Sequence, residues 1–288
     1  MREVAVVTTG FFDGVHLGHR HVLSAVVSSA RERGEEAVVV TFWPHPRTVL
    51  QQDAREFRIL TTLEEKKTLL AAAGIDRVEV LPFTREFAAM TAEEYLAMLR
   101  DRFGATLVVM GYDNRIGSDG KCASDVEESD FVISSGAVGG VEKSPISSTR
   151  IRKALQEGKV EEANGMLGYQ YGLYGAVVAG NRLGRTIGFP TANMQLYEPL
   201  KLVPGNGVYV VDVEVLGRRY QGMCNIGFRP TVGGAARTIE THILDFGEDI
   251  YGLPLRLRFV RRLRDECKFP SLESLRNQLA QDALNCKK

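Results

Sequence analysis

The stretch Val4-Ala5-Val6-Val7-Thr8-Thr9-Gly10-Phe11-Phe12-Asp13-Gly14-Val15-His16-Leu17-Gly18-His19 decides the fold of the first half of this chain. Residues 4–7 form a short apolar run that is typical of a buried strand. After His19, apolar residues recur at spacings of three and four from Val22 to Ala30, which indicates a helix. The glycine-rich segment therefore lies on a turn between a strand and a helix.

The two histidines of this segment are three residues apart, so we expect them on one side of the first turn of the helix. A helix N-terminus offers unpaired N–H groups and partial positive charge, which makes it a site for anions. Two imidazoles at that point suit a polyphosphate. A metal-binding pair and a helix cap are the alternative interpretations. The residues expected to contact a nucleoside triphosphate here are Gly10, Phe11, Gly14, His16, Gly18 and His19.

Length and composition indicate an ordinary globular protein. A chain of 288 residues favours about two domains, and 44% hydrophobic residues are enough for a core. A net charge of zero argues against a general nucleic-acid or membrane-surface binder, whose affinity rests on a basic field. Four widely spaced cysteines predict neither a zinc site nor a disulfide framework. With no signal peptide and no long apolar run evident, we expect a cytoplasmic protein.

The first half alternates strand-like and helical segments. Threonine followed three residues later by glutamate marks two helix starts, at Thr62 with Glu65 and at Thr91 with Glu94. This alternation predicts an α/β domain with a parallel sheet and helices on both faces. The expected strands cover residues 37–42, 78–81 and 106–110, and the expected helices cover 62–73 and 91–103.

Polar segments follow three of these strands. In a parallel sheet, ligands bind at the carboxyl ends of the strands. We therefore expect one pocket to gather the glycine turn, Pro44-His45-Pro46 and Gly111-Tyr112-Asp113. For His45, between two prolines, a site role and a structural turn are both open. Asp113 is open in the same way.

A second motif, Ile146-Ser147-Ser148-Thr149-Arg150-Ile151-Arg152, resembles a helix start with hydroxyls and two arginines. By itself such a run is often only a helix cap. Together, the two motifs resemble the HIGH-type nucleotidylyltransferases, whose first domain is Rossmann-like. That resemblance implies that His16 and His19 stabilise charge on the ATP phosphates, and that no covalent enzyme intermediate forms. It also implies that the triphosphate is held by Ser147, Ser148, Thr149 and Arg152.

The second half is mostly strand-like, and short turns separate its segments. The expected strands cover residues 171–179, 207–215, 219–226, 238–246 and 255–262, followed by a helix over 271–284. This spacing predicts an antiparallel sheet or barrel. We place the domains at 1–168, which includes a helical connector, and 169–288.

The segment from Gly180 to Asn193 contains glycines, arginines and a Phe-Pro step that let backbone approach phosphates closely. Thr191 and Asn193 point the same way in extended backbone, and their oxygens suit Mg²⁺ bound with a nucleotide. Glu240 alternates with apolar neighbours on a strand, where a carboxylate usually faces solvent. From pattern alone, its role in catalysis stays open.

Three segments of this half resemble riboflavin kinases: residues 184–193, residues 225–231 and residues 239–246. The resemblance implies a six-stranded barrel in which Thr191 and Asn193 hold Mg-ATP. It also implies that Gly184 and Gly188 approach the ATP phosphates and that Glu240 accepts the proton of the riboflavin 5′-hydroxyl. General-base assistance of this kind contributes about 10²–10⁴-fold in rate.

Both halves together resemble the bacterial bifunctional riboflavin kinase/FAD synthetase family. This implies that riboflavin and ATP give FMN, that FMN and ATP give FAD and pyrophosphate, and that both steps need Mg²⁺. The sequence identifies no flavoprotein client. Three residues depart from the family pattern: Phe11, where asparagine is common, and Asn114 and Ile116, where aromatic residues are expected. The candidates for flavin contact are His45, Asp113, Asn225 and Arg229.

Two alternatives remain at this stage. One is a nucleotidylyltransferase for another phosphorylated acceptor, with the barrel as a regulatory flavin-binding module. The other is a flavin-sensing regulator, which would need a nucleic-acid-contacting element. No basic cluster or helix-turn-helix pattern supports such an element.

Overall fold

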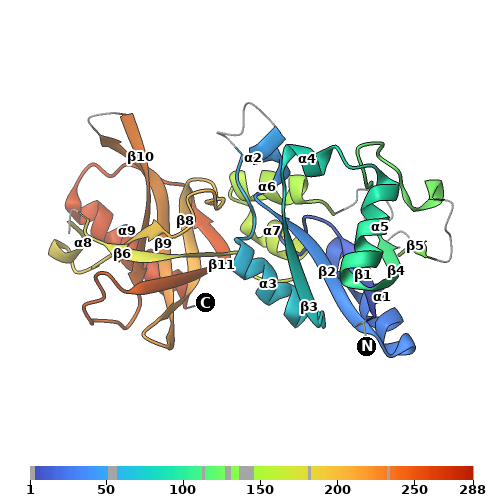
Figure 1. Ribbon diagram of the computed structural model, residues 1–288. Helices are drawn as coiled ribbons and strands as arrows, with labels where there is room; N and C mark the ends of the chain where they lie inside the picture. The colour runs from blue at the N-terminus through green and yellow to red at the C-terminus, as the bar shows by residue number, and fades with distance from the viewer. Residues whose placement is uncertain are drawn as a thin grey trace. The chain divides into compact units, whose positions relative to one another are not determined.

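The structure is a computed structural model that describes residues 4–50, 57–111, 114–126, 131–135, 146–180, 183–231 and 234–287. Its internal contacts divide the chain into two units, Met1–Ser148 and Thr149–Lys288. Each unit is built around its own sheet (Figure 1).

The first unit is a five-stranded parallel sheet in the order β3-β2-β1-β4-β5. The prediction of a parallel α/β domain is confirmed, although the short strand β5 was not predicted. The strands are β1 (Ala5–Thr9), β2 (Glu36–Trp43), β3 (Arg77–Pro82), β4 (Ala105–Met110) and β5 (Val132–Ser134). The helices are α1 (Leu17–Arg33), α2 (Pro46–Leu50), α3 (Leu63–Ala72), α4 (Arg85–Ala88), α5 (Ala92–Phe103) and the 3-10 turn η2 (Ala123–Asp125).

Helices cover both faces of this sheet, as predicted. Successive residues of a strand point to opposite faces, so Val6 packs into the core beneath α1 while Val7 packs into the core beneath α5. Both residues are fully buried. A central strand that is apolar on both faces lies inside such a sandwich, which explains the apolar run from Ala5 to Val7. Val4 precedes β1 and is 45% exposed, so the predicted buried strand began one residue too early.

Local signals place the helix ends of this unit. Glu65 N–H donates to Thr62 Oγ1 at 3.2 Å, and Thr62 N–H donates to Glu65 Oε2 at 2.9 Å. This reciprocal capping satisfies two N–H groups that the helix itself leaves unpaired. The equivalent pair of Thr91 and Glu94 caps α5. Both predicted helix starts are confirmed.

The second unit is a closed antiparallel barrel in the order β10-β7-β6-β11-β8-β9. The six-stranded barrel with a C-terminal helix is confirmed. Strand β7, which carries Asn193, was not predicted as a strand. The strands are β6 (Gly172–Val178), β7 (Ala192–Leu196), β8 (Gly207–Val215), β9 (Arg218–Thr231), β10 (Gly234–Ile243) and β11 (Pro254–Arg264). The helices are α6 (Ser148–Gln156), α7 (Val160–Leu167), α8 (Leu183–Thr186) and α9 (Leu272–Cys286).

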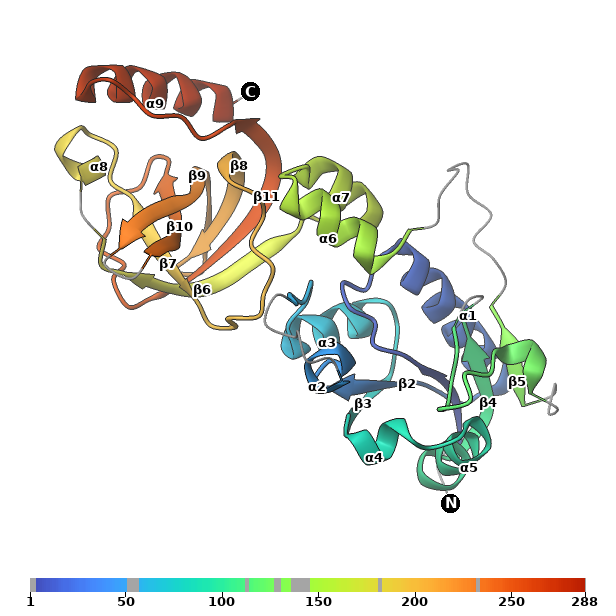
Figure 2. The same ribbon diagram turned by 90° about the horizontal axis from the view of Figure 1, so that it is seen from above.

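The C-terminal helix α9 lies along the outside of the barrel (Figure 2). Leu279 and Cys286 of this helix pack against Val208 and Met223 of the barrel wall. Helix α7 is also fixed to the barrel, because Asn164 Nδ2 donates to the carbonyl oxygen of Phe259 at 2.8 Å. None of the described helices is both long and apolar enough to cross a bilayer.

Candidate active sites

A buried carboxylate holds the glycine turn of the first unit in place. Asp13 is 4% exposed and accepts hydrogen bonds of 3.0 Å from the backbone N–H groups of Leu60 and Thr61. The N–H of Gly14 donates to Thr61 Oγ1, also at 3.0 Å. A buried carboxylate needs such donors to stay ionised without a large penalty. Asp13 was part of the quoted motif, but its anchoring role was missed, since its partners are distant in sequence.

His16 is the N-cap of α1 and not part of its first turn. Its Nδ1 accepts a hydrogen bond of 3.3 Å from the N–H of His19, so the helix-cap interpretation holds for this residue. An Nδ1 that accepts leaves the proton of a neutral ring on Nε2, where it can be donated to an oxygen atom. Gly18 lies close beside this ring, and a Cβ at that position would lie 3.2 Å from the His16 imidazole, so the ring would have to shift slightly.

The two histidine rings stack on each other with centroids 3.6 Å apart. Burial lowers the pKa of His19 well below its usual range, and the charges of His16 and Lys66 lower it further. His19 is therefore neutral at pH 7. Its Nδ1 is buried and has no hydrogen-bond partner among the described residues. A buried polar atom without a partner is a point at which a ligand can bind.

The second motif meets the turn at one position. Ser148 Oγ donates a hydrogen bond of 2.9 Å to the carbonyl oxygen of Asp13, so the last residue of the first unit is tied to the glycine turn. Thr149 and Arg152 follow in α6, inside the second unit. Their contact with a triphosphate stays a prediction, as does that of Ser147.

The turn after β2 lies beside the glycine turn, as expected from the carboxyl ends of parallel strands. The rings of Phe11 and His45 have centroids 5.3 Å apart, and Phe57 packs in a tilted arrangement against His45 with centroids 4.4 Å apart. His45 Nδ1 also accepts from the N–H of Arg47 at 3.2 Å. His45 therefore stabilises a turn and joins an aromatic cluster near the site. Phe11 belongs to this cluster, and its contact with phosphates stays a prediction.

The segment after β4 also approaches the glycine turn. Asn114 Nδ2 donates to the carbonyl oxygen of Thr9 at 3.1 Å, whereas Ile116 is buried in the core beneath α5. Of the three departures from the family pattern, Asn114 thus supports the end of β1, and Ile116 packs in the interior. The flavin-contact candidate Asp113 lies outside the described residues.

The barrel places its candidate residues in one row across three strands. Glu240 of β10 lies directly opposite Asn193 of β7 and, on its other side, directly opposite Asn225 of β9. Cross-strand neighbours have Cβ atoms about 4.5–5.5 Å apart. The adjacent residues Thr241 and Cys224 are fully buried inside the barrel. The row therefore lies on the outer face of the barrel wall, and only strand pairing brings it together.

A pocket of about 570 Å³ lies over this row. Its apolar side chains come from the barrel wall, from the segment between α8 and β7, and from α9 with the loop before it, and its polar side chains include the row itself. Gly184 of α8 also lines it, where a Cβ would lie 2.2 Å from the carbonyl oxygen of Phe189. Gly188 has a φ of +86° and lies outside this lining. The side chain of Arg229 is outside the described residues.

The residues proposed for Mg²⁺ fit that ion in their chemistry. Thr191 and Asn193 both line the pocket and offer a hydroxyl and an amide oxygen, which are the hard ligands that Mg²⁺ takes alongside phosphates. The amide of Asn193 lies over the backbone of Gly180, where an added Cβ would be 2.2 Å from Nδ2. Gly180 thus gives the amide its space. Mg²⁺ would supply positive charge to the nucleotide phosphates at this point.

The sequence did not lead us to predict the pocket wall formed by the end of β11 and the residues after it. Arg264 lines the pocket and is held by the buried Asp282 of α9, with a shortest contact of 2.7 Å. His242 also lines it and fixes the Phe-Pro step through a contact of 2.8 Å between Nδ1 and the carbonyl oxygen of Pro190. The sequence feature that could have indicated this wall is the run of charged residues at the end of the last strand. The other pocket residues from this wall are Glu266, Cys267, Phe269, Leu275 and Leu279.

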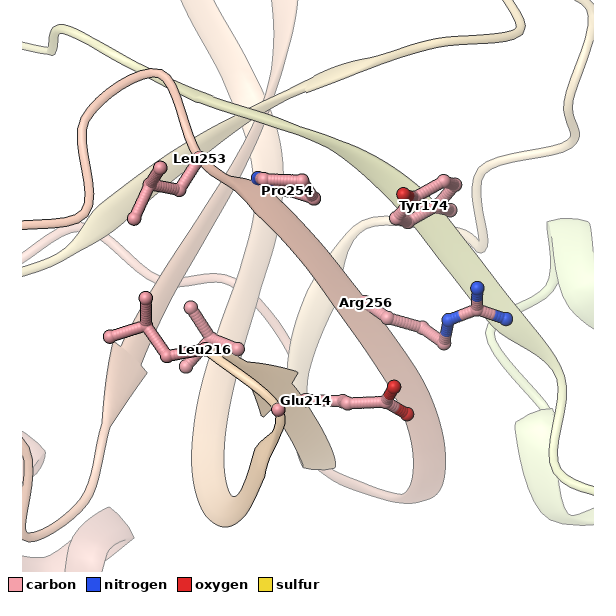
Figure 3. A pocket seen from close by; sticks show the side chains of 8 residues that line it. Tyr174, Glu214, Leu216, Leu253, Pro254 and Arg256 are labelled. Carbon is pink, nitrogen blue, oxygen red and sulfur yellow. The ribbon is translucent and has the colours of Figure 1, made fainter.

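A separate pocket of about 260 Å³ on the barrel contains none of the predicted site residues. Figure 3 shows Tyr174, Glu214 and Arg256 toward one end of it and two leucines toward the other. Arg256 of β11 lies directly opposite Tyr174 of β6 on one side and Glu214 of β8 on the other. Its guanidinium lies 4.7 Å from the centre of the tyrosine ring. These contacts stabilise the barrel wall.

The two folds are those of a nucleotide-dependent transferase, with one candidate site in each unit. The family model of FAD synthetase matches residues 1–150, and that of riboflavin kinase matches residues 167–288. The chain belongs to the family of bifunctional riboflavin kinase/FMN adenylyltransferases. These matches indicate both riboflavin kinase and FAD synthetase activities.

Curated relatives of this family align along almost the whole chain. The protein of Bacillus subtilis (strain 168) is 36% identical over 286 residues, covering 96% of this chain and 90% of the relative. That of Escherichia coli (strain K12) is 36% identical, covering 99% and 93%. A solved structure titled macrolide-efflux protein from Streptococcus pneumoniae is 36% identical, with a TM-score of 0.94, and covers 100% of this chain and 95% of that one.

Proposed function

We propose that the chain makes FAD from riboflavin in two steps, each at its own site. The barrel transfers the γ-phosphate of ATP to riboflavin, and the parallel-sheet unit transfers AMP from a second ATP to the resulting FMN. The observation that carries this proposal is the row Asn193–Glu240–Asn225 beneath the pocket of the barrel. It places a carboxylate beside a candidate magnesium ligand, which is the arrangement that phosphoryl transfer to a hydroxyl needs.

In the kinase step, Glu240 accepts the proton of the riboflavin 5′-hydroxyl. The oxygen then bonds to the γ-phosphorus of ATP while the bond to the β-phosphate oxygen breaks, and ADP leaves. Mg²⁺, when bound with the nucleotide at Thr191 and Asn193, supplies positive charge to the phosphates. Because Glu240 lies opposite Asn193, the base and the phosphate site are adjacent.

Two pockets of the barrel meet at Thr191, which lines both. The larger, of about 570 Å³, contains Glu240 and apolar walls that suit the flat isoalloxazine ring of riboflavin. The smaller, of about 330 Å³, contains Arg185 and the loop from Phe246 to Tyr251. We assign the flavin to the larger pocket and the nucleotide to the smaller one, with the reacting phosphate at Thr191.

In the adenylyl step, a phosphate oxygen of FMN bonds to the α-phosphorus of ATP, and pyrophosphate leaves. The Nε2 proton of His16, the ring of His19 and the N-terminus of α1 stabilise the charge that develops on the phosphates. The neutral state of His19 follows from its lowered pKa. The histidines thus act as hydrogen-bond donors, and positioning carries the reaction.

We further propose that residues 1–168 serve adenylyl transfer and residues 169–288 serve phosphorylation. The two family models leave residues 151–166 to neither domain, and contacts group α6 and α7 with the barrel. The assignment of this helical connector to the first domain stays a prediction. We also propose that the enzyme works in the cytoplasm, where ATP is abundant.

The test is a reaction of the purified chain with riboflavin, ATP and Mg²⁺, in which chromatography separates FMN and FAD. We expect FMN to appear first and FAD afterwards, and FMN with ATP to give FAD directly. Omitting Mg²⁺ should stop both steps. FAD formation from FMN without any FMN formation from riboflavin would contradict the kinase assignment and favour a regulatory barrel.

A further inference from the structure

A lysine on α3 is buried beneath the glycine turn. Lys66 is only 3% exposed, although lysine is among the residues least often found fully buried. Its Nζ donates a hydrogen bond of 3.4 Å to Thr41 Oγ1 of β2. The next residue, Lys67, has a side chain that is 41% exposed and pairs with Glu64 on the surface. Burial is therefore specific to the position of Lys66 and is not shared by its neighbour on the same helix.

The charge of Lys66 is only partly compensated. An ammonium group has three donors, yet the described residues give it one hydrogen bond and no ion pair. Asp13 is near enough to attract it, but the carboxylate oxygens of Asp13 already accept from Leu60 and Thr61. Burial lowers the pKa of Lys66 to about 8, and Asp13 opposes this shift. At pH 7 most molecules thus retain a buried positive charge that has a hydrogen bond to Thr41 but no ion pair among the described residues.

The field of this charge reaches the adenylyl-transfer site. Thr41, which receives the hydrogen bond from Lys66, itself donates to the carbonyl oxygen of Phe11 in the glycine turn at 3.4 Å. Lys66 is also one of the charges that lower the pKa of His19. In a water-excluded interior, a unit charge acts over several ångströms with little screening. Lys66 therefore adds to the partial positive charge of the N-terminus of α1.

We propose that Lys66 is a further residue of the adenylyl-transfer reaction: a buried cation behind the glycine turn whose field favours the triphosphate and the departing pyrophosphate. This inference rests on the adenylyl transfer proposed above. Lys66 exchanges no proton and forms no bond. The bonds that change are those at the α-phosphorus, and Lys66 lowers the energy of the negative charge that moves onto pyrophosphate. A bound polyphosphate would supply negative charge that balances the charge of Lys66.

The test compares three variants in FAD formation from FMN, ATP and Mg²⁺. Lys66→Met removes the charge and keeps an unbranched chain, Lys66→Arg keeps the charge, and Lys67→Met is the matched surface control. We expect Lys66→Met to lower kcat/KM for ATP by about 10²-fold, in the range found for a lost electrostatic contact at a reacting centre. Lys66→Arg should lose less than about tenfold, and Lys67→Met should match the parent chain.

A pH series separates this role from a structural one. Among the described residues, the titratable groups that interact electrostatically with Lys66 are Asp13 and His19, and carboxylates and imidazoles ordinarily titrate below pH 8. We expect kcat/KM for ATP in the parent chain to fall as the pH rises from 8 to 10, because Lys66 loses its charge. This fall should be absent in Lys66→Arg, since arginine stays charged.

Two results would overturn the inference: activity of Lys66→Met within twofold of the parent, or equal losses in Lys66→Met and Lys66→Arg with a level parent profile above pH 8. The pH profile of the parent chain needs no variant, so a folding defect in Lys66→Met leaves the test intact. If the parent chain itself makes no FAD from FMN, the proposed function fails instead.

Discussion

Ser148 Oγ donates a hydrogen bond of 2.9 Å to the backbone carbonyl oxygen of Asp13. The two residues are 135 positions apart, and each belongs to one of the two motifs that indicate adenylyl transfer. The same Asp13 is anchored through its carboxylate to residues 60 and 61. One residue of the glycine turn therefore connects the second motif to the body of the sheet, which gives a specific target for mutation.

Ser148→Ala should weaken ATP binding in FAD formation. A neutral hydrogen bond contributes a net 0.5–1.5 kcal/mol, roughly a twofold to tenfold effect, so we expect KM for ATP to rise by about that factor. The measurement is steady-state FAD formation at varied ATP. FMN formation by the barrel in the same preparation is the control and should not change. An unchanged KM in Ser148→Ala would show that the tie to Asp13 does not position the site.

His19 should remain neutral well below the usual pH of imidazole titration. Its folded-state pKa lies below its unfolded value because burial penalises the charged ring. Below about pH 6.5, the unfolded chain therefore binds more protons at this residue than the folded chain does. For this reason the free energy of unfolding is higher above that pH and falls as the pH decreases. An NMR titration should show no protonation shift of the His19 ring between pH 8 and pH 6.

The variant His19→Gln gives the matching stability measurement. Its melting temperature should fall less steeply than that of the parent chain when the pH is lowered from 7 to 5, since the proton uptake by His19 on unfolding is gone. Equal slopes for the two proteins, or a His19 ring that titrates near pH 6.5, would contradict a buried neutral imidazole.

Glu240→Gln should separate the two activities. Loss of the proton acceptor is expected to lower the rate of FMN formation by about 10²–10⁴-fold, while FAD formation from added FMN continues at the parent rate. Glu214→Gln is the matched control, because Glu214 lies on the same barrel but pairs with Arg258 away from the row. Equal loss of both products in Glu240→Gln would contradict two independent sites.

Gly180→Ala should disturb the candidate magnesium site without touching the base. The new Cβ would lie 2.2 Å from Asn193 Nδ2, so the amide must move. We expect the Mg²⁺ concentration for half-maximal FMN formation to rise several-fold. Gly165→Ala on α7 is the control, because a Cβ there meets nothing within 4 Å. A parent-like Mg²⁺ requirement in Gly180→Ala would remove Asn193 from the proposed ligands.

Short-range patterns predicted much of the fold. The run of residues 4–7, the glycine turn and the periodic residues from Val22 onward gave β1 and α1, and threonine–glutamate pairs gave two helix starts. These features depend on interactions within a few residues, which the sequence displays directly. Strand β7 was missed because its residues Ala192–Leu196 lack a regular alternation, and pairing with β6 and β10 holds them extended.

By itself, the sequence determined the two fold classes, the order of the domains and the residues that carry the family motifs. Tertiary structure decided how those residues are used. Strand pairing placed Glu240 between Asn193 and Asn225, and long-range contacts made Asp13 an anchor and Lys66 a buried cation. The physical reason is that periodicity and capping are local, whereas the burial of a charge depends on which distant segments exclude water from it.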